Sequence, residues 1–269
     1  MGVQFPPDLH TFIMKKLLAI LLLITTTCLA QVPGVQARSY IVTDLEGNVL
    51  ISHDAQSIRP IASITKLLVA EQLTSELRPT DSVIIQRSDI GATHSRLRVR
   101  TKLTQQQLLE LALICSSNQA IVALARSHDT PKIIAAVNAV AKARGLTTIS
   151  IDEPSGLSNN NRASAEDLAK FVSLLNDPLI EKITTQTLTS YGKFHSTNPY
   201  LGKPEWNFLI SKTGYTSVAG GCVLTKLTLN GKTLIVVILG SRNTRTRWAD
   251  LMKIKTFLMD TETLKIAAK

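Results

Sequence analysis

The 269-residue sequence has few cysteines and few aromatic residues, and what is scarce excludes several classes of protein. Its three cysteines are too few for a fold held together by disulfides. Cys115 and Cys222 stand in apolar or glycine-rich runs, where small buried thiols are common. The five histidines are scattered without the spacing of zinc ligands. We therefore expect two free thiols, no metal site and no cofactor.

Long hydrophobic runs are scarce as well. The apolar run from 17 to 24 is far shorter than the ~20 residues that a membrane-spanning helix needs. It follows Lys15 and Lys16 and precedes a small polar stretch, which together form the three regions of a secretory signal. We expect residues 1–30 to be an N-terminal extension and secretory signal, cut after Ala30 or Ala37. The mature protein is then expected in the periplasm, without a stable membrane anchor after signal cleavage.

Acidic residues are fewer than basic ones. The chain has 30 lysines and arginines against 20 aspartates and glutamates, a formal net charge of +10. Such a charge favours anionic partners, and for an exported protein these are a carboxylate-rich wall polymer or a lipid surface. No basic run is interleaved with aromatic residues, so we expect no nucleic-acid partner and a solvated surface for most of the cations.

Three short stretches carry residues suited to nucleophilic catalysis. Ser63 and Lys66 lie three positions apart at the start of an apolar, helix-like run, so both fall on one face of the helix. A neutral, partly desolvated lysine there can take the serine proton. Ser-x-x-Lys alone also describes an ordinary polar helix start with a solvated lysine. The stretches 116–118 (Ser-Ser-Asn) and 212–214 (Lys-Thr-Gly) follow in order, although a helix cap and a strand end would explain each singly.

The periodicity of the chain predicts its fold class. Alternating residues at 39–43 and 49–52 predict a hairpin, and the middle of the chain is mostly helical. From 207 the pattern returns to period two and predicts three antiparallel strands, with Lys212 at the end of the first. We expect an α+β fold, an antiparallel sheet flanked by helices with an inserted helical lobe, in a single catalytic domain over residues 38–269.

In this order the three stretches resemble the motif set of the low-molecular-mass penicillin-binding proteins, the D-alanyl-D-alanine peptidases that act on peptidoglycan. Ser117 departs from that set, which has aspartate there. The likeness extends over the exported part of the chain and includes Pro60–Ser63, Glu153–Leu157, Asn176–Ile180 and Ala219–Cys222. The resemblance implies a β-lactamase/penicillin-binding-protein-like fold and a serine peptidase of the penicilloyl-serine transferase type.

The resemblance also implies a role for each motif residue. Ser63 is the expected acylated nucleophile and Lys66 its base, while Ser116 and Asn118 relay a proton to the leaving amine and hold the substrate amide. Lys212 and Thr213 face the substrate carboxylate, and Gly214 lets the strand edge approach. The backbone N–H groups of Ser63 and Tyr215 form the oxyanion hole. Glu153 is expected to be a loop residue, and His195 and Asn198 are placed near the cleft.

Several activities remain open at this level. The chain stops soon after its C-terminal helix, where carboxypeptidase relatives continue into a β-rich domain and an amphipathic tail. We therefore favour DD-endopeptidase activity on cross-links over D-alanyl-D-alanine carboxypeptidase activity. A serine β-lactamase and a non-catalytic β-lactam-binding sensor are weaker alternatives. The expected partners are peptidoglycan stem peptides, with β-lactams as covalent inhibitors.

Overall fold

The computed structural model describes residues 31–91 and 97–260. The chain from residue 31 onward forms a compact unit by itself. Its strands are β1 (Ser39–Thr43), β2 (Val49–His53), β3 (Arg59–Pro60), β4 (Ser82–Ile84), β5 (Lys102–Thr104), β6 (Arg162–Ala163), β7 (Asn207–Thr216), β8 (Gly220–Leu229) and β9 (Lys232–Ser241). Its helices are η1 (Ala62–Ile64), α2 (Thr65–Thr74), η2 (Arg87–Ile90), α3 (Gln105–Leu113), α4 (Asn118–Ser127), α5 (Thr130–Ala143), α6 (Ala165–Leu174), α7 (Pro178–Thr184) and α8 (Thr246–Asp260).

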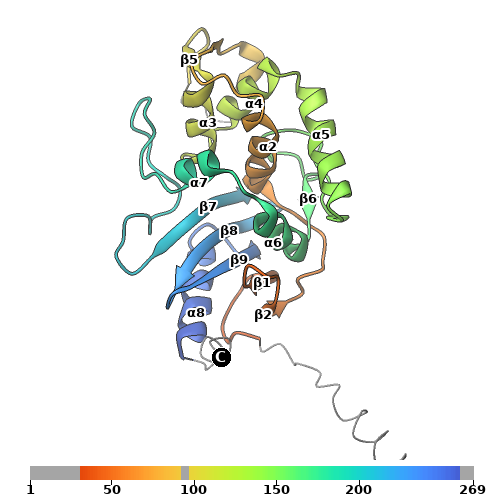
Figure 1. The fold of residues 1–269 in the computed structure, drawn as a ribbon, viewed down its shortest axis with the longest axis vertical. Coiled ribbons are helices and arrows are strands. Elements are labelled where there is room, and N and C mark those ends of the chain that lie inside the picture. The colour runs from red at the N-terminus through yellow and green to blue at the C-terminus, as the bar shows by residue number, and fades with distance from the viewer. Residues whose placement is uncertain (1–30, 92–96, 261–269) are drawn as a thin grey trace, which may run out of the picture. The chain divides into compact units, whose positions relative to one another are not determined.

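The main sheet joins the two ends of the described chain. Its five strands lie in the order β2-β1-β9-β8-β7, and every neighbouring pair is antiparallel. Most helices inserted between β2 and β7 build the lobe, whereas α6 packs on the sheet (Figure 1). This arrangement confirms the predicted α+β fold class.

Both faces of the sheet are covered, and the side chains of β9 show how. Ile235, Val237 and Leu239 point into the core shared with α6 and the lobe. The alternate residues of β9 point into a second core under α8 and the segment before β1. Period-two alternation sends successive side chains to opposite faces, so a strand covered on both sides is apolar throughout.

The segment before β1 is part of this second core. Val32 is buried, and its N–H donates to the Tyr40 hydroxyl at 2.9 Å. The Gln36 N–H donates to the buried Asp250 carboxylate of α8 at 2.9 Å. Residues 32–37 therefore pack on the sheet together with α8.

The lobe is organised around α2, which contacts α3, α4, α5 and α7 (Figure 1). Most of its residues are buried, as expected of a helix that is apolar on nearly all sides. A capping box begins α3, because Thr104 and Gln107 exchange side-chain and backbone hydrogen bonds.

The structure corrects one expected boundary. β7 does not end at Lys212 but continues to Thr216, so Lys212 lies in mid-strand and pairs with Leu224. Gly214 lies beyond the expected strand end and pairs with Cys222 inside the ladder. A glycine within a strand often marks a close approach of another backbone, and that is its setting here.

Two smaller observations bear on the sequence analysis. Cys115 and Cys222 are not joined by a disulfide, as expected, although Cys115 is only partly buried. Across the described ranges, none of the helices combines the length and the apolar character needed to traverse a bilayer.

Candidate active site

The Ser63 turn lies where the lobe meets the sheet. Ser63 belongs to the 3-10 turn η1, immediately before α2, and Lys66 is the second residue of α2. Ala62 adopts a positive φ of 48°, and the Thr65 hydroxyl donates to the Ala62 carbonyl at 2.8 Å. The Ile61 N–H donates to the Asn161 carbonyl at 3.0 Å and ties the turn to the loop before α6. The turn thus holds Ser63 in one defined orientation.

Two glycines lie against the backbone of this turn. A Cβ on Gly156 would lie 2.1 Å from the Ala62 carbonyl oxygen, and a Cβ on Gly214 would lie 2.8 Å from the Ile61 carbonyl oxygen and 3.0 Å from the Ser63 nitrogen. Gly156 also has a φ of +82°, a conformation that favours glycine. The loop before α6 and strand β7 can therefore both approach the Ser63 backbone only because these positions lack a side chain.

The Lys66 amine is completely buried and donates to three acceptors. Its Nζ lies 2.8 Å from Ser63 Oγ, 2.7 Å from Asn118 Oδ1 and 2.5 Å from the Ser155 carbonyl oxygen. Burial lowers the pKa of Lys66 from 10.5 to about 7, while the charges of Glu153 and Cys115 oppose that shift. A lysine of this kind is partly neutral near pH 7 and can accept the Ser63 proton over one hydrogen bond.

The second motif forms the turn between α3 and α4. Ser116 has a φ of +60°, and Asn118 begins α4. The Ser117 hydroxyl accepts the Ala120 N–H at 3.3 Å as the N-cap of α4, so it has a structural partner. The turn directs Ser116 toward β7 and Asn118 toward Lys66.

Lys212 joins the second and third motifs. Its buried Nζ donates to Ser116 Oγ at 2.8 Å and to the Thr213 carbonyl at 2.9 Å. Burial is the largest cause of the lowered pKa of Lys212, and the positive charges of Lys66 and Arg247 lower it further. Each of the two lysines thus donates to one serine hydroxyl. Six side chains of the three motifs and the Gly214 position lie around one site.

The loop before β7 contributes a residue that the sequence analysis missed. The Thr213 hydroxyl donates to Thr197 Oγ1 at 2.7 Å, and the Thr197 N–H donates to the Ile114 carbonyl at 3.1 Å. Asn198, expected near the site, donates instead to Ser211 Oγ at 2.9 Å, and His195 forms a bridge with Leu188. No local sequence pattern marks Thr197, because it meets Thr213 only when β7 lies opposite this loop.

Glu153 organises the loop that faces Lys66. Its carboxylate accepts the N–H groups of Ser155 (2.7 Å), Gly156 (2.5 Å) and Ser158 (3.2 Å) and the amide of Asn161 (3.0 Å). It also accepts the Ser155 hydroxyl at 2.6 Å. Glu153 is therefore a loop residue, as predicted, but one that fixes the Ser155 carbonyl against Lys66.

Arg247 is a second residue without an advance signal in the sequence. It is buried at the start of α8, and its Nη1 donates to the Gly214 carbonyl at 2.8 Å. Gly221 leaves room for it, because a Cβ there would lie 3.1 Å from Arg247 Cβ. The Tyr215 side chain, by contrast, is 48% exposed, so only its backbone belongs to the strand edge.

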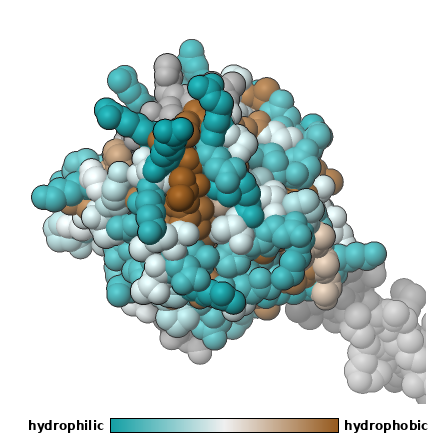
Figure 2. Space-filling model, turned by 90° about the horizontal axis from the view of Figure 1, so that it is seen from above, coloured by the Kyte–Doolittle hydropathy of each residue, from teal (hydrophilic) through white to brown (hydrophobic). Residues whose placement is uncertain are grey.

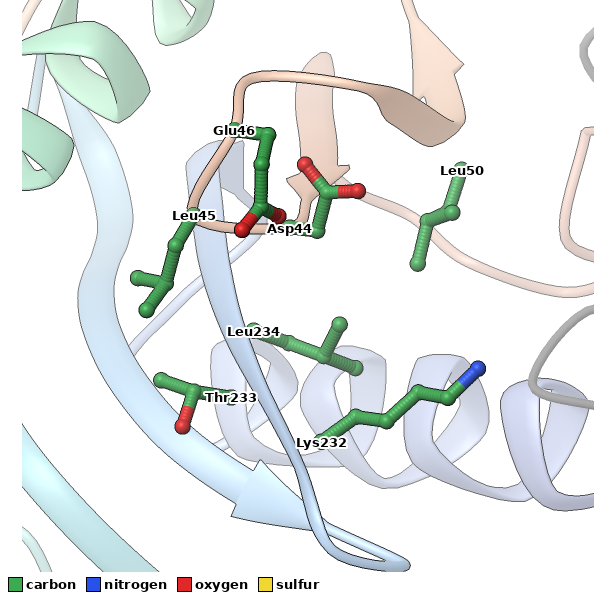
Figure 3. Close-up of a pocket in the computed structure, with 7 residues that line it drawn as sticks. All are labelled: Asp44, Leu45, Glu46, Leu50, Lys232, Thr233 and Leu234. Carbon is green, nitrogen blue, oxygen red and sulfur yellow. The ribbon is translucent and has the colours of Figure 1, made fainter. Parts of the chain in front are cut away.

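A separate hollow of about 260 Å³ lies at the opposite end of the sheet (Figure 3). Asp44, Glu46 and Lys232 line it, beside Leu45, Leu50, Thr233 and Leu234. In the β8–β9 ladder Lys232 pairs with Leu229, whereas Gly221, near the motif site, pairs with Ser241. The hollow holds no paired nucleophile and base. Within 31–91 and 97–260, no His, Cys, Asp and Glu side chains cluster as metal ligands do.

Comparisons with known proteins agree with this constellation. A family model described as D-alanyl-D-alanine carboxypeptidase matches residues 26–243. A D-alanyl-D-alanine endopeptidase of Escherichia coli is 30% identical over 257 residues, which cover 89% of this chain and 82% of that protein. The enzyme of the same name from Pseudomonas aeruginosa is 32% identical, over 82% of this chain and 76% of that protein. A D-alanyl-D-alanine carboxypeptidase of Mycobacterium tuberculosis is 26% identical, over 77% of this chain and 76% of that protein.

A solved structure shares the fold. Penicillin-binding protein D2 from Listeria monocytogenes, in its cefotaxime-bound form, superposes with a TM-score of 0.74 at 25% sequence identity, covering 81% of this chain and 95% of that one. The resemblance inferred from the motifs is thereby confirmed. The chain belongs to the D-alanyl-D-alanine carboxypeptidase family and is a serine-type peptidase.

Proposed function

We propose that this protein is a DD-endopeptidase that hydrolyses D-alanyl bonds in peptidoglycan cross-links through an acyl-enzyme on Ser63. The observation that carries the proposal is the 2.8 Å contact between Ser63 Oγ and the buried Lys66 amine, whose pKa is about 7. Nucleophile and base are thus within hydrogen-bond reach, and the base is partly neutral near neutral pH.

In the acylation step Ser63 Oγ attacks the D-alanyl carbonyl carbon while Lys66 Nζ takes the hydroxyl proton. The carbonyl oxygen becomes an oxyanion, which the N–H groups of Ser63 and Tyr215 are proposed to stabilise. As the intermediate collapses, the carbon–nitrogen bond breaks and the leaving amine takes a proton from the Ser116 hydroxyl. Lys212, 2.8 Å from Ser116 Oγ, replaces that proton.

Substrate binding uses the remaining motif residues. The Asn118 Oδ1 atom accepts from Lys66, which directs its amide nitrogen away from the lysine and toward a substrate carbonyl. The Lys212 ammonium and the Thr213 hydroxyl are proposed to bind the carboxylate next to the cut amine.

Once the amine has left, the Lys66 ammonium releases the proton that it took from Ser63 to solvent, and Lys212 regains a proton from solvent. A water molecule then attacks the ester carbonyl carbon and loses a proton to the neutral Lys66 amine. The carbon–oxygen bond to Ser63 breaks as Lys66 passes that proton to Ser63 Oγ.

The preference for cross-links rests on the relatives. The two proteins named endopeptidase are 30% and 32% identical to the chain, whereas the one named carboxypeptidase is 26% identical. Both leaving groups carry a carboxylate beside the amine, so Lys212 and Thr213 engage either. Selection between them is assigned to the surrounding loops, including residues 195–204.

The test compares two defined substrates. Purified protein is incubated with cross-linked muropeptide dimers and with pentapeptide monomers, and products are resolved by mass. We expect a higher kcat/KM on dimers, no activity on either in Ser63→Ala, and loss on both in Lys212→Ala. Ser173→Ala, on the exposed side of α6, is the matched control and should retain activity. Faster release of D-alanine from monomers would establish the carboxypeptidase alternative instead.

β-Lactams are the proposed covalent inhibitors. The Listeria relative was solved with cefotaxime bound, and the motif set that carries the acylation chemistry is present here. Peptide mapping after incubation with a β-lactam should find one acyl group, on Ser63. An adduct on another residue would contradict the assigned nucleophile, and rapid turnover of the drug would favour a β-lactamase.

We also propose that residues 1–30 are the secretory signal and that the catalytic domain begins directly after it, in the periplasm. Burial of Val32 and the bond from the Gln36 N–H to Asp250 support cleavage after Ala30 rather than Ala37, because the later cut would remove both contacts. N-terminal sequencing of the exported protein tests this: Gln31 is expected, and Arg38 would contradict it.

A further inference from the structure

The end of the lobe farthest from the sheet carries an unusual surface. The short strands β4 and β5 lie there (Figure 1), and Figure 2 shows a hydrophobic stripe on this face between long hydrophilic side chains. Two aliphatic side chains of this end are exposed, Ile84 to 53% and Val99 to 41%. Ile84 pairs across the strands with Lys102, so an aliphatic and a cationic side chain stand together.

The same surface has an excess of positive charge. Its exposed cations are Arg87, Arg98, Arg100 and Lys102, and within the described part of the chain none of the four forms an ion pair. The acids of the adjoining segments are mostly neutralised: Glu76 pairs with Lys132, Asp81 with Arg78 and Asp89 with Arg126, while Asp129 caps α5. Four cations therefore face solvent against one unpaired acid.

We propose that this basic face, formed by Ile84, Arg87, Arg98, Val99, Arg100 and Lys102, docks the protein reversibly on an anionic phospholipid surface. Cations that attract lipid phosphates, set beside aliphatic side chains that enter the headgroup boundary, are the combination that interfacial binding uses. A soluble anionic polymer would match the four cations, but it offers no apolar phase to Ile84 and Val99. The aliphatic residues thus favour the lipid.

Docking by this face also orients the active site. α2 starts beside Ser63 and ends four residues before Arg78, near the basic face. Its 10 residues span ~15 Å at 1.5 Å each, so Ser63 and the basic face lie toward opposite ends of α2, with Ser63 where the lobe meets the sheet. The site is then free to receive a polymeric substrate while the protein is held at the membrane.

The experiment is vesicle co-sedimentation of the unit from residue 31 onward, which holds both cores. We compare pure phosphatidylcholine vesicles with vesicles in which one third of the lipid is phosphatidylglycerol. Binding is expected only to the anionic vesicles, and it should vanish in ~1 M salt, where the Debye length is ~3 Å. Arg98→Gln/Arg100→Gln should weaken partitioning about 25-fold, at about five-fold for each cation.

Matched variants separate the effect of the basic face on vesicle binding from the effect of net charge. Lys142→Gln/Lys182→Gln removes two exposed cations elsewhere and should bind like the parent protein. Ile84→Asn should weaken vesicle binding several-fold without changing net charge, and circular dichroism confirms that each variant is folded. Equal losses in the two double variants, or unchanged binding in Ile84→Asn, would overturn the proposal. So would retention on lipid-free cell-wall sacculi without binding to vesicles, which would assign the face to a wall polymer.

Discussion

The depressed pKa of Lys66 predicts the pH dependence of acylation. A lysine with the ordinary pKa of 10.5 is neutral in only ~0.03% of molecules at pH 7, whereas with a pKa of about 7 roughly half of the molecules carry the neutral amine. Burial therefore raises the population of competent base ~1,500-fold at pH 7. Because only the neutral amine takes the Ser63 proton, acylation should fall about tenfold per pH unit below pH ~7 and level off above it.

The assay is the second-order rate of acylation by a fluorescent penicillin, measured by stopped flow between about pH 5 and pH 9. Lys66→Arg retains the positive charge but does not deprotonate in this range, so acylation should be lost at every pH. The wild-type profile tests the assigned pKa without any substitution, and circular dichroism checks that Lys66→Arg is folded. A flat wild-type profile, a rate that still rises tenfold per pH unit at pH ~9, or near-normal acylation by a folded Lys66→Arg protein would refute the assigned base.

The same shift has a consequence for stability. The folded-state pKa of Lys66 lies below its unfolded value, so between about pH 7 and pH 10.5 the unfolded chain binds more protons than the folded one. The contribution of Lys66 is therefore most favourable above pH 10.5, declines as the pH falls to about 7 and is constant below, with a slope of at most ~1.4 kcal/mol per pH unit. Lys66→Met should reduce that slope in urea titrations across this window.

Three further substitutions test how the site is held. Gly156→Ala should lower the melting temperature and slow acylation, because its Cβ would meet the Ala62 carbonyl; Gly145→Ala, with a φ of +72° but open space, controls for backbone strain, and equal effects would contradict the steric explanation. Glu153→Gln should shift the acid limb of the acylation profile to lower pH, because the Glu153 charge raises the pKa of Lys66; an unmoved limb, as expected for Glu166→Gln, would exclude that coupling. Ser117→Asp should keep stability and acylation, whereas Ser117→Ala should cost ~1 kcal/mol in urea unfolding; a loss of activity in folded Ser117→Asp would show that position 117 does more than cap α4.

The local sequence pattern was enough to predict those parts of the fold that have a single hydrophobic periodicity. The β1–β2 hairpin, the Thr104 capping box and the strands β8 and β9 follow from alternation, turn residues and caps within a few positions of each other. The sheet built from both chain ends also followed, because strands flanked a helical middle. These features depend on residues that are close in the sequence, so a sequence pattern can predict them.

The residues that were missed depend on contacts between distant segments. Thr197 meets Thr213 across 16 positions, and Arg247 reaches Gly214 across 33, so neither has a local pattern. The first C-terminal strand was expected to end at Lys212, yet it continues through Gly214, where the missing side chain lets the strand approach the Ser63 turn. Glu153 accepts backbone N–H groups of its own loop. These hydrogen bonds form only when the loop is folded beside Lys66, so no sequence pattern predicts them.

The departure of the second motif from the family pattern has a local explanation. Position 117 lies between Ser116, whose hydroxyl meets Lys212, and Asn118, whose amide meets Lys66, but its own side chain turns back to accept the Ala120 N–H. That task is N-capping, for which aspartate and serine are about equally good. The two flanking residues must therefore keep their identities, because each contacts a lysine of the site, while position 117 must only begin α4. A serine there keeps the turn, and with it the placement of Ser116 and Asn118, intact.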